Sequence, residues 1–167
     1  PLYSSAASDV YKRQVISGEA KVERSVSTTN SSNIDGSTSV TAGEVIYEYN
    51  PETGLLSKAS GNKVTEGNDI FGNIYLTTTK DTYAVIKGEA KLIYSESETA
   101  NRNIDGSHSK TTNWIRYEYT TGDEKPSQLP SNYSQDGKVI VGLCKEASSE
   151  NRTEGNDIFG NTFTQDI

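Results

Sequence analysis

Residues 80–99 read KDTYAVIKGEAKLIYSESET, two runs of strand-forming residues that meet at Lys87-Gly88. A two-residue corner ending in glycine between such runs is the short-range signal of a β-hairpin. The same corner occurs earlier in the chain, because residues 15–21 read VISGEAK where residues 85–91 read VIKGEAK. The stretch therefore predicts a hairpin that the chain uses twice.

The duplicated hairpin belongs to a long internal repeat. Three further segments recur, the first two at an offset of 70 residues and the third at 88: NIDGS at 33–37 and 103–107, YEY at 47–49 and 117–119, and TEGNDIFGN at 65–73 and 153–161. The larger offset means that the second copy carries 18 additional residues, which fall between Tyr119 and Ala147. A fixed period of this kind is the signature of repeat architectures, in which neighbouring units complete one another's core.

The repeat divides the chain into three parts. Residues 15–84 form repeat unit 1, and residues 85–167 form repeat unit 2, with an inserted loop around residues 120–138 and an end that stops before its last strand is complete. Residues 1–14 precede the first unit, and residues 4–14 (SSAASDVYKRQ) resemble a translated transposase adapter from a sequencing library. We therefore expect a non-native beginning on a fragment of environmental, metagenomic origin.

The periodicity within a unit is that of strands. Val45, Tyr47 and Tyr49 alternate with polar neighbours, which puts the tyrosines on one face of a sheet, where we expect them to form a buried seam. No segment repeats apolar residues at helical spacing. The predicted fold is all-β, with about four strands per unit, as tandem antiparallel β-hairpin repeats forming an extended or spiralling twisted sheet.

Composition narrows the function classes. Leu, Ile, Val and Phe are 32 of the 167 residues, too few for a large aliphatic core. The net charge of −7 argues against binding to nucleic acid, and no apolar run approaches the roughly 18 residues that span a bilayer. A single cysteine cannot form an internal disulfide.

The acidic residues of the turns recur between the units. Asp35 returns as Asp105, and Asp69 returns as Asp157, each next to the glycine or asparagine of a predicted turn. Aspartate in such positions accepts hydrogen bonds from the turn's own backbone, so we interpret these residues as turn formers. Calcium binding by the same carboxylates is the alternative, because hard cations take oxygen ligands from loops.

Unrepeated residues are the candidates for ligand contact. Trp114 is the only tryptophan and stands where the first unit has Glu44, so it either stacks on a sugar or a partner or packs against a neighbouring strand. Tyr133 lies beside the inserted loop. His108 and Cys144 lack partners for catalysis, and we expect an exposed strand residue and a half-buried strand thiol. We assign no catalytic, cofactor-binding or metal-binding residue, and we expect neither a cofactor nor enzymatic activity.

Residues 47–56, YEYNPETGLL, resemble the tyrosine-aspartate repeat of YD/RHS-type proteins, in which two tyrosines precede a turn, a glycine and a leucine. Residues 136–140, after Tyr133, resemble a second instance, and the DIFGN segments resemble other stretches common in that family. Asn50 and Thr120 stand where the family usually has aspartate. The resemblance implies long β-hairpins that coil into a spiral sheet in large bacterial secreted or cell-surface proteins.

These observations predict a structural repeat segment, such as a stalk, fibre or shell, located outside the cell or on its surface. Its expected partners are neighbouring repeats of the same chain, with no nucleic acid and no membrane span. The alternative is an adhesin-like module that binds a glycan or a surface protein through Trp114 and the loop near Tyr133.

Overall fold

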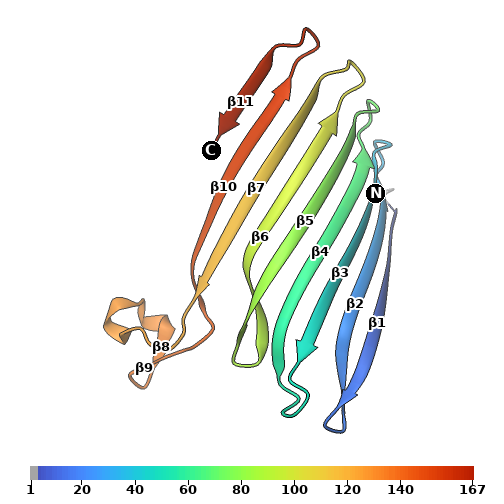
Figure 1. The fold of residues 1–167 in the computed structure, drawn as a ribbon. Coiled ribbons are helices and arrows are strands. Elements are labelled where there is room, and N and C mark those ends of the chain that lie inside the picture. The colour runs from blue at the N-terminus through green and yellow to red at the C-terminus, as the bar shows by residue number, and fades with distance from the viewer. Residues whose placement is uncertain (1–3) are drawn as a thin grey trace.

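The structure is a computed structural model, which describes residues 4–167, and it consists almost entirely of β-strands. Nine strands form one antiparallel sheet in which each strand pairs with the next along the chain (Figure 1). The prediction of an all-β fold built from consecutive hairpins is confirmed. The sheet is open and twisted, and it does not coil into the spiral that the YD/RHS resemblance implies.

The strands of the large sheet are long for a globular protein, most of them 12 to 14 residues. They are β1 (Ser4–Ile16), β2 (Glu19–Ser32), β3 (Thr38–Tyr49), β4 (Leu56–Asn68), β5 (Ile74–Ile86), β6 (Glu89–Arg102), β7 (His108–Tyr119), β10 (Cys144–Asn156) and β11 (Thr162–Asp166). Between β7 and β10 lie two short 3₁₀ turns (Pro126–Gln128 and Ser131–Tyr133) and a two-stranded ribbon of β8 (Ser134–Gln135) and β9 (Lys138–Val139). The inserted loop is therefore partly structured.

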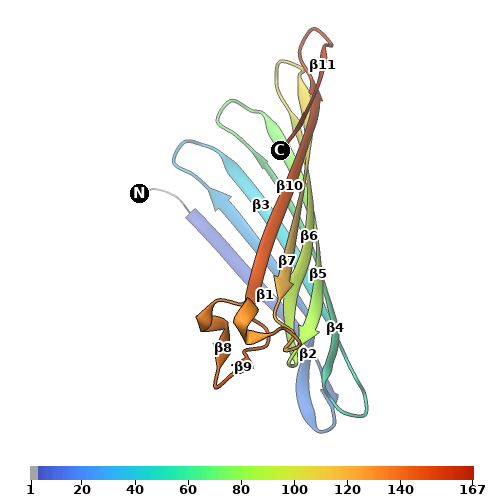
Figure 2. The same cartoon turned by 90° about the vertical axis from the view of Figure 1, so that its left-hand side faces the viewer.

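The sheet is a single layer with solvent on both faces. Figure 2 shows it nearly edge-on, with no second sheet or helix over either face. The accessible surface is 11215 Å², whereas a compact monomer of this mass exposes about 8,100 Å². Within residues 6–167, Ala59, Thr79 and Thr120 are the buried residues other than glycine. The tyrosines form a half-buried seam rather than the buried one predicted, because no layer covers them.

The two repeat units occupy equivalent positions in the sheet. Strands β2 and β3 correspond to β6 and β7 at an offset of 70 residues, and β4 corresponds to β10 at 88. The segment that resembles an adapter, residues 4–14, lies within β1 and pairs with β2 as β5 pairs with β6. The repeat seen in the sequence is thus a repeat of strands.

Four β-bulges bend the sheet at the same level. The extra residues are Glu23 on β2, Ser57 on β4, Ile93 on β6 and Lys145 on β10, so they follow the same offsets as the repeat. Each lies toward the lower end of the sheet in Figure 1, near the turns that join β1 to β2 and β5 to β6. Because a bulge increases local twist, these positions account for the stronger twist at that end.

Glycine and aromatic residues pair across the upper part of the sheet. Gly67 lies opposite Tyr75, and a Cβ atom built on Gly67 would lie 2.6 Å from both that ring and the carbonyl oxygen of Thr38. Gly155 and Phe163 repeat the arrangement, with the ring 2.7 Å from the corresponding position. An aromatic ring that covers a strand glycine replaces the packing that the glycine cannot supply.

We expect Gly67→Ala to lower the free energy of unfolding by about 1–3 kcal/mol, because the methyl group overlaps a backbone oxygen that cannot move aside. Gly43→Ala is the matched control, since its nearest neighbour is the Ser27 hydroxyl at 3.3 Å, and it should change the free energy by less than about 1 kcal/mol. Denaturant unfolding of the full chain measures both. Equal stability of the two variants would contradict the close approach.

Candidate functional site

A row of threonines crosses the sheet at right angles to the strands. Its members are direct cross-strand partners on seven successive strands, all half-buried: Thr29, Thr41, Thr65, Thr77, Thr99, Thr111 and Thr153. We call the side of the sheet that carries them the threonine face. Because cross-strand partners share a face and neighbouring strands lie about 4.8 Å apart, the row is continuous over the whole width of β2 to β10.

The hydroxyl groups of this row bond in alternate pairs. The Oγ1 atoms lie 2.9 Å apart for Thr41 and Thr65, and the pairs Thr77–Thr99 and Thr111–Thr153 repeat the contact at 2.9 and 3.0 Å. Sequence reasoning missed the row, although a signal exists. Each threonine lies six residues from the centre of a turn, at residue 35, 71, 105 or 159, and an even number of steps keeps it on one face.

The tyrosines gather on the same face toward the lower end. Tyr47 lies opposite Ala59, and the Tyr83 ring comes within 3.5 Å of the position that a Cβ of Gly61 would take. The small residues of β4 thus leave room for rings from both neighbouring strands. Burial, together with the charge of Asp81, raises the pKa of Tyr83. This cluster is the nearest approach to a core in the described chain.

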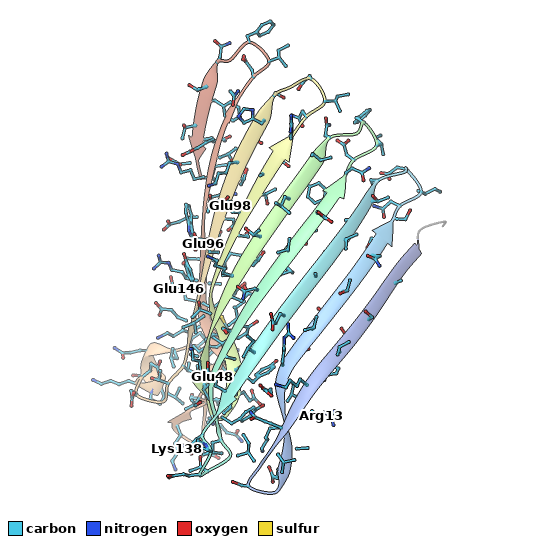
Figure 3. The ribbon with its side chains drawn as sticks, turned by 45° about the vertical axis from the view of Figure 1, so that its right-hand side comes forward. Arg13, Glu48, Glu96, Glu98, Lys138 and Glu146 are labelled. Carbon is cyan, nitrogen blue, oxygen red and sulfur yellow. The ribbon has the colours of Figure 1, made fainter. Side chains whose placement is uncertain are left out.

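The opposite side, which we call the charged face, carries cross-strand ion pairs. Lys110 Nζ lies 2.7 Å from Glu98 Oε2, and Figure 3 labels Glu98 and Glu96 on β6. Trp114 lies between strands that each present a glutamate, because Glu96 and Glu150 are its cross-strand partners. Its indole Nε1–H donates to Glu96 Oε1 at 3.3 Å. Trp114 is half-buried in the sheet interior.

The inserted segment is tied to the sheet at two points. Thr120, which is fully buried, donates from Oγ1 to the Ile140 carbonyl at 2.6 Å and accepts from the backbone N–H of Leu143 at 3.0 Å. The Tyr133 hydroxyl donates to the Cys144 carbonyl at 2.6 Å. Both bonds close the neck of the loop, so Tyr133 holds the segment against the beginning of β10.

The structure keeps the two proposed ligand-contact residues apart. Trp114 pairs with Glu150, whereas Tyr133 contacts Cys144, six residues earlier on β10. They do not form one site. His108 is exposed at the start of β7, as predicted. Cys144 is exposed rather than half-buried, because β11 pairs only with residues 152–156 and leaves the beginning of β10 at the sheet edge.

The turn aspartates bond to their own loops, which confirms their interpretation as turn formers. Asp69 Oδ1 accepts from the backbone N–H groups of Phe71 and Asn73, at 2.8 and 3.0 Å, and Oδ2 accepts from the Asn73 side chain at 2.7 Å. Hydrogen bonds from Ser37 lower the pKa of Asp35. Among residues 4–167, no cluster of three or more His, Cys, Asp or Glu side chains is arranged to hold a metal ion.

The upper hairpin turns share one further property, which is exposed apolar side chains. These are Ile34, Ile70, Phe71, Ile104, Ile158 and Phe159, between 51% and 81% exposed. All lie in the four turns 33–37, 69–73, 103–107 and 157–161, at the top of Figure 1. We call this set the apolar tips.

Comparisons with protein-family models, with curated protein sequences and with solved structures find no match for this chain. Over the described residues, the structure contains no helix with the length and apolar character needed to cross a membrane. The class that the fold defines is an open, single-layer antiparallel repeat sheet.

The inserted segment provides a pH-dependent contact. The Glu124 carboxylate is hydrogen-bonded by its own backbone N–H and by those of Thr121 and Gly122, which lowers its pKa from 4.5 to about 2. Because the pKa is lower in the folded state, this contribution to stability is complete above about pH 4.5 and is lost as the pH falls toward 2.

We therefore expect Glu124→Gln to reduce the loss of stability between pH 4.5 and 2, measured by denaturant unfolding at several pH values. Amide chemical shifts of Thr121 and Gly122 should titrate with a midpoint near pH 2 in the unsubstituted chain. Glu52→Gln removes one negative charge from the equivalent turn of unit 1 and should leave the pH dependence unchanged. A midpoint near 4.5 for the two amides would contradict the assignment.

Proposed function

We propose that the chain is a structural repeat segment, of the stalk, fibre or shell type, in a larger bacterial secreted or cell-surface protein. In this role the chain supplies a rigid ribbon of paired strands, and its partners are the neighbouring repeats. The mechanism is mechanical, because backbone hydrogen bonds between strands carry the cohesion of the sheet.

The pairing between the two units is the observation that carries the proposal. Strand β5 of unit 1 and β6 of unit 2 make 13 register pairs, more than the nine between β2 and β3 within unit 1. The threonine row also continues across this boundary, from Thr77 to Thr99. Units that join more extensively than their own hairpins pair are suited to forming a long sheet.

A second candidate is an adhesin-like module, favoured by the single unrepeated aromatic residue of the charged face. Trp114 replaces Glu44 at an otherwise equivalent position, so a ligand contact there would be specific to unit 2. Glycan-array binding that Trp114→Ala abolishes, while Tyr94→Ala preserves it, would favour this candidate over the scaffold.

The scaffold proposal predicts that an added unit stabilises the sheet. A chain with residues 15–84 duplicated in tandem should melt several degrees higher than the original, because each new neighbour adds a paired interface. The control carries Thr41→Asp, Thr65→Asp and Thr77→Asp in the added copy, where like charges face one another across strands, and should gain little. A melting temperature that the intact third unit leaves unchanged would count against the scaffold.

A further inference from the structure

The apolar tips form a continuous ridge along one end of the sheet. Hairpin turns on alternate strand pairs lie about 10 Å apart, so four of them extend over about 30 Å. Two neighbouring turns touch directly, since the backbone N–H of Ile104 donates to Asn73 Oδ1 at 3.0 Å. The Ile104 side chain also lies 3.5 Å from the Cβ position of Gly72. The tips are therefore held as one surface.

The opposite end of the sheet differs in chemistry. Its turns are Ser17-Gly18, Lys87-Gly88 and residues 50–55, where Leu55 is the one large apolar residue exposed within a turn. The tips, by contrast, expose Phe159 to 81%, Ile34 and Ile104 to 74% and Phe71 to 70%. A chain with so few large apolar residues thus presents six of them at one end.

The turns are prepared for an apolar environment. In both DIFGN turns the aspartate stands at the base, and its carboxylate accepts the N–H groups that the turn leaves free, as in the bonds of 2.9 and 2.8 Å that Asp157 receives from Phe159 and Asn161. Burying an unpaired backbone group would oppose insertion. With these N–H groups paired internally, the isoleucine and phenylalanine at the apex can leave water at less cost.

The shape and size of the ridge indicate what covers it. A ridge about 30 Å long and 10 Å wide offers about 300 Å², whereas a stable protein interface buries about 800 Å² on each partner. A second copy meeting it tip to tip would therefore fall short. A convex row of apolar apices needs no matching surface when it enters a fluid lipid interface.

Charge in the same region agrees with a shallow position in lipid. Arg102 and His108 are cross-strand partners directly beneath the turn that holds Ile104, and both are exposed. They lie one step below the apices, where lipid phosphates would be in reach of the guanidinium group. Because the chain carries a net charge of −7, a neutral bilayer suits it better than an anionic one.

We infer that the apolar tips dock the sheet end-on to the interface of a zwitterionic lipid bilayer, with Phe71 and Phe159 as the inserted residues and no part of the chain crossing the membrane. This inference does not depend on the scaffold role of the sheet.

The test is flotation of the full chain with neutral phosphatidylcholine vesicles. The unsubstituted chain should float with the vesicles, and the double variant Phe71→Ser, Phe159→Ser should bind at least about tenfold more weakly, because two exposed rings no longer transfer from water. Leu55→Ser, a matched substitution at the opposite end of the sheet, should bind as the unsubstituted chain does. Equal melting temperatures of the three proteins would show that folding is unaffected.

A spectroscopic arm reports insertion directly. In a chain with Trp114→Phe and Phe71→Trp, the single indole should shift its emission to the blue when vesicles are added. No flotation of the unsubstituted chain, or equal flotation of the tip variant and the Leu55→Ser control, would overturn the inference. Tip-dependent self-association in sedimentation, without vesicle binding, would instead assign the ridge to a second copy and would also overturn it.

Discussion

The structure depends on strand register, because nothing else holds a single-layer sheet together. Side chains alternate between faces with a period of two, so a slip of one residue would move every threonine of the row to the charged face. The offsets of 70 and 88 residues are both even, and the four bulges recur at the same offsets. Each repeat therefore restores the pattern of faces that the previous one ends with.

The inserted segment shows how the register survives an insertion. Its 18 additional residues leave the sheet after Tyr119 and return at Cys144, which are themselves cross-strand partners. In unit 1 the equivalent turn is closed by Asn50, whose Oδ1 accepts from two backbone N–H groups of the turn. In unit 2 the Thr120 hydroxyl does similar work at the neck of a longer loop. The departures from aspartate at these two positions thus keep a side-chain oxygen that bonds to the backbone.

Sequence reasoning predicted the features that are local along the chain. The Lys87-Gly88 corner has φ values of 52° and 80°, as the hairpin signal requires, and the turn aspartates follow from composition alone. The threonine row was out of reach because it arises only when strands far apart in sequence are placed in register. The exposure of Cys144 and the separation of Trp114 from Tyr133 were missed for the same reason, since both depend on which strand lies alongside β10.

The absence of a second layer also explains where the apolar residues go. A sheet with solvent on both faces has no interior, so rings collect where small neighbours let them cover a strand, as Tyr83 does beside Gly61 and Tyr75 does over Gly67. The tips obey no such rule, because a turn that serves only to reverse the chain needs no isoleucine or phenylalanine at its apex. The same pair, Ile-Phe, stands at 70–71 and at 158–159 while the lower corners are polar, so the apolar apex is a property of one end of the repeat and not of its turns in general. A scaffold whose two ends differ in this way has a direction, and the apolar end is the one that meets another phase.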